Sequence, residues 1–476
     1  MDVSLLKRRI RKIGGKSSEN GKCVIYVMSR DQRTKDNHAL LAAQKHALAK
    51  KLPLAVVFCL YEKSGYRARE QYQWMLRGLQ EVEQDLAKFN IPLMLLIGDP
   101  KQRIAGLIHH THPDAVYFDF SPLRGPRAVA DYIAKLDDAP TVYVVDTHNI
   151  IPLWDLSNKQ EVAAYTIRPK VHRLLSAFLA EPDALENHPY PWPGEVRTIA
   201  ELQEVIDEIL VKLPANGSPI TFQSGSKAAH EQLETFISDR LSQYALMRNI
   251  PSEQFSSDLS PYLHFGQLSS LRVALRLQEE LAKSGSDLHL LHSPKMPSAG
   301  SETSISDGAN ALLEEMIVRK ELSDNFCYYQ PQYTSLNGGP QWAQDSLTEH
   351  RADPREFLYN YEQLAKGETH DAAWNAAQLQ MVKTGKMHGY MRMYWAKKVL
   401  EWTESPEQAI DFLIRLNDFY SIDGGDPNGY VGILWSVVGV HDRPWTERAV
   451  FGKIRYMNYG GLKRKFDIAA YERMWN

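Results

Sequence analysis

The chain has 476 residues, is 43% hydrophobic and 24% charged, and carries a formal net charge of −3. This length exceeds what one hydrophobic core usually serves, so two domains are expected. No apolar run reaches the roughly 20 residues that span a bilayer, and three cysteines without CxxC spacing (Cys23, Cys59 and Cys327) are typical of a reducing compartment.

The chain opens with a basic segment, LLKRRIRKIGGKSS (Leu5–Ser18). The segment lacks the long apolar stretch of a secretory signal peptide. Two interpretations remain, a short helix and the import signal of a eukaryotic protein, and we favour the helix.

Short runs rich in Val, Ile, Leu, Phe and Tyr then alternate with helical stretches. The predicted strands are Cys23–Met28, Leu54–Leu60, Leu93–Ile97, Ala115–Phe120 and Thr141–Val145, and the predicted helices include Ala39–Lys50, Glu70–Phe89 and Lys101–His109. This alternation predicts a parallel sheet with helices on both faces, whose ligands bind beyond the carboxyl ends of the strands. No GxGxxG follows the first strand; Ser29–Arg33 stands there instead, which argues against a nicotinamide dehydrogenase.

A stretch rich in Pro, Glu and Asn separates this region from the rest of the chain. It runs from Pro182 to Gly225 and predicts an interdomain connector with a short helix at Ala200–Lys212. From Ala228 onward helical periodicity dominates. The expected division is an α/β domain over residues 20–180, a connector over residues 181–226 and a helical domain over residues 227–476.

One stretch without periodicity, Ser284–Asn310, interrupts the helical region. Its Ser, Gly, Pro and His content predicts a mobile surface loop. His289 and His292 lie in it, but we expect no metal site there.

Two motifs of the helical region suit a ligand with phosphates. SSDLSPYL (Ser256–Leu263) places hydroxyls and a capping residue before a helical run, where free backbone N–H groups favour phosphate; an ordinary helix cap is the plainer interpretation. SIDGGDPNGY (Ser421–Tyr430) predicts tight backbone turns, and the ligand spacing of a calcium-binding EF-hand is missing from it.

Trp395 and Trp402 lie seven residues apart in a stretch with helical character, GKMHGYMRMYWAKKVLEW. On an α-helix this spacing places both rings on nearly one face, about 10.5 Å apart along the axis. Rings at that separation can pass an electron by hopping. Two core aromatic residues are the plainer interpretation.

The segment His441–Phe466 carries a net charge of +5 and five aromatic residues. Its basic residues are Arg443, Arg448, Lys453, Arg455, Lys463, Arg464 and Lys465. Basic and aromatic residues in one segment favour a surface for phosphates and bases. A solvated basic tail is the alternative.

The region from Trp374 to Asp467 closely resembles the C-terminal catalytic region of class II cyclobutane pyrimidine dimer DNA photolyases. The other matching segments are MSRDQRTKDN (Met28–Asn37), DLSPYLHFGQLSS (Asp258–Ser270), RKELSDNFCYY (Arg319–Tyr329) and GKIRYMNY (Gly452–Tyr459). The resemblance covers nearly the whole chain, in the family's order. It implies a Rossmann-like α/β domain followed by an all-α FAD-binding domain, the photolyase/cryptochrome fold.

The resemblance also implies an FAD site. The residues it assigns to this site are Tyr244, Ser256, Ser257, Leu259, Ser260, Glu321, Asn325, Asn417, Asp423 and Asp426, with Asn417 facing the flavin N5. It further implies a salt bridge between Arg248 and Asp442 beside the flavin. A light-harvesting deazaflavin or folate is expected near Arg30–Asn37 and Tyr117–Arg124.

The remaining implied roles concern the damaged base pair, electron supply and DNA. Glu315, Tyr390, Met393 and Trp435 match residues around the lesion, whereas Arg319 stands where some relatives have a Trp. The implied electron relay is Trp395, Trp374 and Trp402, with Tyr359 as a further donor. The implied DNA-binding residues are Arg443, Lys453, Arg455, Lys463, Arg464 and Lys465.

The activity that the resemblance implies is light-driven repair of cyclobutane pyrimidine dimers in double-stranded DNA. An electron would pass from excited FADH⁻ to a dimer flipped out of the duplex. We expect a monomer that does not bind membranes, placed with the nucleoid of a prokaryote or in the nucleus of a eukaryote. The alternatives are a cryptochrome-like photoreceptor, a (6-4) photolyase and an unrelated nucleotide-binding α/β protein.

Overall fold

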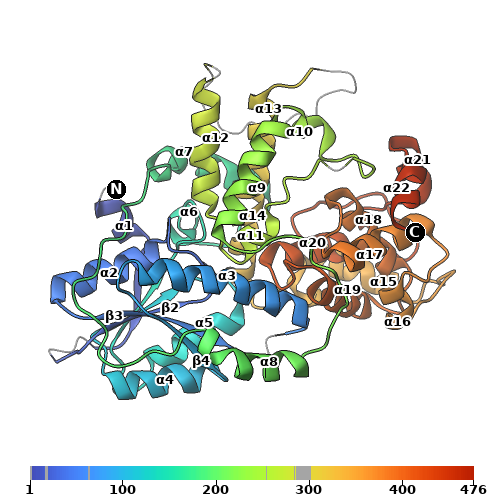
Figure 1. The fold of residues 1–476 in the computed structure, drawn as a ribbon. Helices are drawn as coiled ribbons and strands as arrows, with labels where there is room; N and C mark the ends of the chain where they lie inside the picture. Colours follow the sequence, from blue (N-terminus) through green and yellow to red (C-terminus); the bar gives the residue numbers. More distant parts are fainter. Residues whose placement is uncertain (1–2, 17–19, 63–64, 254, 284, 286–301) are drawn as a thin grey trace.

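Six strands form one sheet in the N-terminal third of the chain, in the order β1-β6-β5-β2-β3-β4 (Figure 1). The computed structural model describes residues 3–16, 20–62, 65–253, 255–283, 285 and 302–476. The strands are β1 (Ile10–Gly14), β2 (Val24–Met28), β3 (Leu54–Leu60), β4 (Leu93–Ile97), β5 (Ala115–Asp119) and β6 (Thr141–Val145). β1 runs antiparallel to β6, and the other four pairings are parallel.

Helices cover both faces of this sheet. They are α2 (His38–Lys50) and α3 (Arg69–Ala87) on one face, and α4 (Pro100–Thr111) and α5 (Arg124–Ala134) on the other (Figure 1). All five residues of β2 are buried, because Tyr26 and Met28 enter the core under α2 and α3 while Ile25 and Val27 enter the core under α4 and α5. A strand buried on both faces reads as a continuous apolar run, so its position could be predicted from the sequence.

The basic N-terminal segment is only partly a helix. α1 covers Val3–Arg8, as predicted, but Ile10–Gly14 forms the edge strand β1, which the sequence did not indicate. Arg11 and Lys12 are exposed on β1, and charges on an edge strand hide the alternation that marks an inner strand. Arg9, between the two elements, is buried and donates hydrogen bonds to the carbonyl oxygens of residues 146, 149 and 150 at 2.6–3.0 Å.

Helices dominate the rest of the chain. They are α6 (Leu153–Leu156), α7 (Ala164–Phe178), η1 (Ala200–Leu202), α8 (Gln203–Lys212), α9 (Ser226–Asp239), α10 (Leu241–Met247), α11 (Ser260–His264), α12 (Ser270–Lys283), α13 (Ile305–Leu313), the π-helix η2 (Glu314–Arg319), α14 (Lys320–Tyr329), η3 (Leu336–Gly338), α15 (Gln341–Glu349), α16 (Tyr361–Lys366), α17 (Ala372–Thr384), α18 (Gly389–Glu401), α19 (Pro406–Tyr420), α20 (Pro427–Val438), α21 (Tyr459–Lys465) and α22 (Ile468–Trp475). No helix within the described part of the chain is both long and apolar enough to cross a membrane.

The predicted loop over residues 284–310 extends too far at its C-terminal end, because α13 already begins at Ile305. Most of that stretch, including His289 and His292, lies outside the described residues.

The hydrophobic cores do not follow the predicted domain boundary at residue 226. One large core joins the α2 and α3 side of the sheet to α9–α13 and to the connector helix α8. A second core lies among α15–α20 and the C-terminal helices. The division into residues 20–180, 181–226 and 227–476 therefore stays a prediction, because one core contains residues from all three parts.

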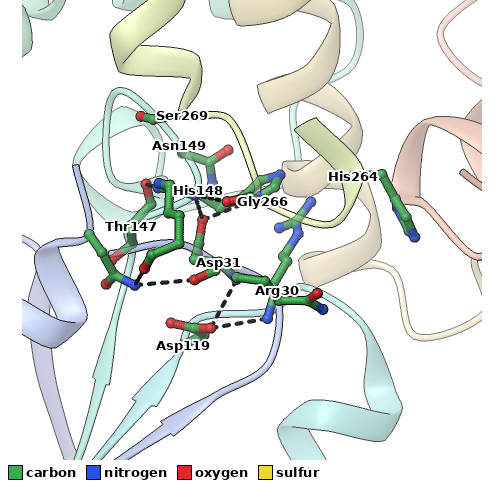
Figure 2. A network of polar contacts seen from close by, with 12 residues as sticks. Arg30, Asp31, Asp119, Thr147, His148, Asn149, His264, Gly266 and Ser269 are labelled. Atoms are coloured by element: carbon green, nitrogen blue, oxygen red, sulfur yellow. Dashed lines mark hydrogen bonds and ion pairs between the residues drawn. The ribbon is translucent and has the colours of Figure 1, made fainter. Parts of the chain in front are cut away.

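A buried polar network lies where the carboxyl ends of the strands meet the helical region (Figure 2). Oδ2 of Asp119, at the end of β5, accepts the backbone N–H groups of residues 29, 30 and 31 at 2.8–3.0 Å. Burial and the nearby Asp31 raise the pKa of Asp119 to about 7. Asp31 is buried too, but its ion pair with Arg33 and the ring of His148 hold its pKa below the ordinary value.

Helix α14 is attached to the α/β domain by paired charges. Arg30 donates two hydrogen bonds to Asp324, at 2.6 and 2.8 Å, and their side chains are only 10% and 1% exposed. Lys320 donates to the backbone oxygen of His148 and to Oδ1 of Asn149, at 3.0 and 3.1 Å. These contacts fix the angle at which α14 meets the sheet.

We predict that Asp324→Ala lowers the free energy of unfolding by about 3–5 kcal/mol, because it leaves Arg30 buried without its partner. Chemical denaturation of the full chain measures this change. The matched control is Asp155→Ala, which removes the partner of the 40% exposed Arg8 and should cost about 1 kcal/mol or less. Equal losses in the two variants would contradict the role given to the buried pair.

Candidate functional site

A cavity of about 480 Å³ opens among η2, α18, α20 and the segment around α11; it is called the helical cavity below. Its volume lies within the roughly 300–1,000 Å³ typical of small-molecule sites. The predicted site residues that line it are Tyr244, Ser257, Ser260, Glu315, Met393, Trp395, Asn417, Asp423, Asp426 and Trp435. Residues up to 191 positions apart in the sequence thus meet at one place.

Two helix starts shape the wall of this cavity. Asp426 caps α20, since its Oδ1 accepts the backbone N–H of Asn428 at 2.9 Å. Gly389 begins α18 and Gly432 lies within α20; both line the cavity, and apart from each glycine's chain neighbours and the backbone of its own helix no heavy atom lies within 4 Å of where a Cβ would stand. The backbone of both helices is therefore open to a ligand.

Arg392, which was not predicted from the sequence, lines the helical cavity among its polar residues. Its guanidinium donates to Oδ1 of Asn417 at 2.8 Å and to Oγ of Ser421 at 2.9 Å, and lies 3.6 Å from Asp423. Burial alone would raise the pKa of Asp423, but Arg392 and the Ser421 hydroxyl outweigh it and keep that pKa below its ordinary value. The one signal in the sequence for a role of Arg392 was its position three residues before Trp395, on a helix with many buried positions.

Glu315 extends into the cavity from the π-helix η2, and π-helical turns are frequent at functional sites. The Tyr244 hydroxyl donates to Oε2 of Glu315 at 2.7 Å, and Arg248 forms an ion pair with Oε1. The Glu315 side chain is 44% exposed because it faces the open cavity. The surrounding protein still raises the pKa of its carboxyl, with Arg248 acting in the opposite direction.

The predicted salt bridge between Arg248 and Asp442 is wrong in this structure. Arg248 follows α10 and pairs with Glu315, whereas Asp442 follows α20 and lies 3.5 Å from Arg455. Neither Arg248 nor Asp442 lines the helical cavity. Each of the two residues pairs instead with an opposite charge from another segment. Position in the sequence does not reveal which segment that is.

Glu321 and Asn325 were predicted to bind the cofactor, but they belong to the contact between the domains. Oε1 of Glu321 accepts the backbone N–H groups of Ile150 and Ile151, at 2.8 and 3.3 Å. Asn325 accepts from the backbone N–H of residue 161 and donates to the carbonyl oxygen of residue 159. The prediction failed because α14 turns these residues toward the α/β domain.

Three further predicted residues lie just outside the helical cavity. Leu259 is fully buried, and Ser256 donates its hydroxyl to Asp258 at 2.5 Å. Tyr390 packs edge-on against Phe466, with the Lys465 ammonium 4.4 Å from its ring centre. The helical run predicted at the SSDLSPYL motif exists as α11, which begins at Ser260 within the motif, but it is only five residues long.

Four aromatic rings lead from the cavity to the protein surface. Trp395 lines the cavity, and its ring centre lies 6.5 Å from that of Trp374, with the two planes only 12° apart. Trp374 is followed by Trp402 at 5.7 Å and by Tyr359 at 5.5 Å. The three indoles are at most 2% exposed, and Tyr359 is half-buried. The rings lie in the order that the sequence analysis predicted.

A second series of side chains joins the cavity to the basic segment. Trp435 lines the cavity, and the Arg455 guanidinium lies 5.6 Å from its ring centre and 4.1 Å from that of Trp445. Arg443 is exposed and lies 5.6 Å from the same Trp445 ring. Lys453, Lys463, Arg464 and Lys465 are exposed nearby in sequence, the last three at the end of α21. A cationic surface therefore reaches the wall of the cavity.

A second cavity of about 540 Å³, called the interdomain cavity below, lies beyond the carboxyl ends of β2, β3 and β5. Arg30, Phe118, Asp119 and Ser121 line it from the α/β domain, which is the region expected to hold a second chromophore. His264 and Asp426 line both cavities. Among the described residues, no group of three His, Cys, Asp or Glu side chains is placed to hold a metal ion.

Comparison with known proteins gives consistent results. A family model described as DNA photolyase matches residues 24–191. The chain is 42% identical over 479 residues to the deoxyribodipyrimidine photo-lyase of Potorous tridactylus, covering 98% of this chain and 84% of that protein. It is 43% identical over 461 residues to the protein of that name from Arabidopsis thaliana, covering 94% and 88%.

The fold has solved counterparts. An archaeal photolyase from Sulfolobus tokodaii, described with two FAD molecules and an implied light-harvesting cofactor, superposes with a TM-score of 0.67 at 16% identity. The match covers 95% of this chain and 89% of that one. The predicted fold class, an α/β domain followed by a helical domain, is confirmed.

Lys397 provides a prediction about pH, because it is buried behind Trp435. Its ammonium donates to the Ser436 carbonyl oxygen at 2.9 Å, and burial lowers its pKa to about 7. Above that pH the unfolded chain holds a proton that the folded protein has released, so wild-type stability should rise with pH by up to about 1.4 kcal/mol per unit.

Lys397→Met should remove that rise between pH 7 and the ordinary lysine pKa of 10.5. Denaturation curves of both proteins across this range measure it, with the exposed Lys463→Met as control. Parallel stability curves for wild type and Lys397→Met would show that the pKa of Lys397 is not lowered in the folded protein.

Proposed function

The chain belongs to the DNA photolyase family, and we propose that it is a deoxyribodipyrimidine photo-lyase, an enzyme that uses light to repair cyclobutane pyrimidine dimers in DNA. One observation carries the proposal. A single cavity is lined at once by Trp395, the first ring of a buried aromatic series, and by Trp435, which borders a cationic surface. Neither the site nor these relatives favour the photoreceptor alternative.

The helical cavity fits FAD. Hydroxyls, two amides, two guanidinium groups and three carboxylates line it together with apolar side chains, which suits a ligand with a polar chain and flat rings. Open space at Gly389 and Gly432 lets a ligand approach the backbone closely. Bound there in its fully reduced form, FAD would supply the light-excited electron donor.

The residues of this chain then have distinct tasks at the cavity wall. Arg392 holds Asn417 and Asp423 in place, so a fixed amide and a paired charge meet the ring system. Ser257, Ser260 and Asp426 are available to the polar chain of the cofactor.

Glu315 is the residue that we assign to the lesion. Tyr244 and Arg248 fix one side of its carboxyl, and the other side faces the cavity. A raised pKa favours the protonated acid, which donates a hydrogen bond to a pyrimidine carbonyl. Met393 and Trp435 supply the apolar surface on which the bases pack; Tyr390 lies behind this lining, against Phe466.

DNA binds, in this proposal, on the cationic surface next to Trp435. Arg443, Lys453, Lys463, Arg464 and Lys465 are exposed and contact phosphates, while Arg455 packs against both Trp445 and the cavity-lining Trp435. A dimer that has already weakened its stacking is flipped into the cavity at a cost of a few kcal/mol. We infer that the protein acts as a monomer, because one chain carries all of these residues. It would act in the compartment that contains the cell's DNA.

The interdomain cavity takes the light-harvesting chromophore in this proposal. Aromatic and aliphatic side chains such as Phe58, Met75 and Phe118 line it beside Arg30 and Lys101. This combination suits a flat conjugated molecule with anionic or carbonyl groups, as a deazaflavin or a folate has.

The direct test is repair of an oligonucleotide with one cyclobutane dimer, under blue or near-ultraviolet light, by protein with fully reduced FAD. We expect dimer loss in light and none in the dark. Glu315→Ala should slow repair at least about tenfold, since one donor to the developing charge is lost. The exposed Glu279→Ala serves as control. Dimers that persist under light with wild-type protein would refute the function.

The aromatic series gives a separate expectation. Trp395→Phe should prevent photoreduction of oxidised FAD, because the first ring of the series is removed, yet leave repair by prereduced protein nearly unchanged. Flavin absorbance under light measures the first property and the oligonucleotide assay the second. Trp342→Phe changes an indole outside the series and should alter neither. Equal losses of photoreduction and repair in Trp395→Phe would contradict the relay.

A further inference from the structure

The two cavities are separated by a wall that both share. His264, at the end of α11, and Asp426, the cap of α20, line the helical cavity and the interdomain cavity alike. Figure 2 shows His264 apart from the Arg30–Asp31–Asp119 cluster, at the edge of the interdomain network. A change in the contacts of these two side chains at one cavity therefore also alters the lining of the other cavity.

Both carboxylate oxygens of Asp426 are engaged. Oδ1 accepts from the backbone N–H and the side-chain amide of Asn428, at 2.9 and 3.1 Å. Oδ2 lies 2.9 Å from Nδ1 of His264, whose side chain is only 8% exposed. The carboxylate that faces the helical cavity is thus held by a helix start on one side and an imidazole on the other.

The imidazole is held in turn by Arg67, which comes from the α/β domain just before α3. Its Nη2 lies 3.3 Å from Nε2 of His264, and its guanidinium lies 5.8 Å from the Phe265 ring. Arg67 also lies against the turn before Asp426, since its Nη2 is 3.5 Å from where a Cβ of Gly425 would stand. Arg67 lines the interdomain cavity and not the helical cavity.

These contacts determine which imidazole nitrogen carries the proton. A guanidinium can only donate, so Nε2 of a neutral His264 must accept. The proton therefore stands on Nδ1, from which it is donated to Asp426. Without Arg67 the other tautomer becomes available, and its bare Nδ1 would face the Asp426 carboxylate and repel it.

We propose that Arg67 is a positioning residue for the flavin, acting through His264 on Asp426, and that this relay couples the two cavities. A ligand of the interdomain cavity whose carbonyl or anionic group engages Arg67 then changes the affinity of the helical cavity for FAD. The inference rests on the proposed function, which makes both cavities cofactor sites. It assigns a part of the flavin site to the α/β domain.

The first test needs no second ligand. FAD is titrated into the full chain freed of cofactor, its fluorescence gives the dissociation constant, and the stoichiometry is fitted so that FAD in the interdomain cavity is counted separately. Arg67→Met should raise the dissociation constant about five- to tenfold, and Arg67→Lys, which keeps a donor, should restore part of the affinity. Arg77→Met, which changes an exposed cation of α3 outside both cavities, should have less than about a twofold effect.

A second pair of variants separates the relay from a general loss of structure. In the His264→Phe background, Arg67→Met should have no further effect on FAD affinity, because the residue through which it acts is gone. Thermal unfolding of the proteins without FAD monitors the fold. Unchanged FAD affinity in Arg67→Met, or an equal effect of Arg67→Met with and without His264, overturns the relay.

The coupling is tested with folic acid and with a 5-deazaflavin as probes of the interdomain cavity. A bound probe should change the FAD dissociation constant, FAD should change that of the probe by the same factor, and Arg67→Met should abolish both effects. Equal FAD affinity with and without a bound probe overturns the coupling.

The possible failures can be told apart. If wild-type protein binds no FAD, the proposed function fails. If FAD binds but neither probe does, the chromophore site fails, and the Arg67 variants alone decide the relay.

Discussion

The attachment of one helical run to the α/β domain determines where the functional residues stand. η2 and α14 follow one another from Glu314 to Tyr329, and the Arg30–Asp324 ion pair anchors the second half against the carboxyl ends of the strands. Glu315, in the first half, is thereby placed at the cavity. Because the run is continuous, a shift of the α14 anchor would move the Glu315 carboxyl as well.

Burying so many charges would be unfavourable unless each had partners. The interdomain network meets this condition for most of its atoms: Asp119 accepts three backbone N–H groups, and Asp324 accepts from both Arg30 and Asn149. Such a network contributes more to orientation than to net stability, since a misplaced domain would leave several charges unpaired. A site assembled from two cores requires that kind of fixed orientation.

The proposed chemistry gives electrons and DNA separate access to the helical cavity. The aromatic series runs from the helical cavity through the second core. Its three indoles are almost fully buried, and the half-buried Tyr359 follows them next to Trp402. The cationic surface meets the cavity elsewhere, at Trp435 and Arg455. The cavity wall combines the guanidinium groups of Arg319 and Arg392 with three carboxylates, two amides, two imidazoles, hydroxyls and apolar surface.

The inner strands and several helices of the α/β region could be predicted from the sequence, because buried strands and amphipathic helices are local patterns. The long motifs indicated the family, and through it ten residues that line the helical cavity. The packing of distant segments pairs Arg248 with Glu315, brings Arg392 to Asn417, and turns Glu321 and Asn325 toward the α/β domain; local patterns reveal none of these contacts. It also placed His264 and Asp426 between two cavities. The reason is physical: a charged side chain pairs with whichever opposite charge or polar group the packing brings within reach, and that neighbour can be hundreds of residues away along the chain.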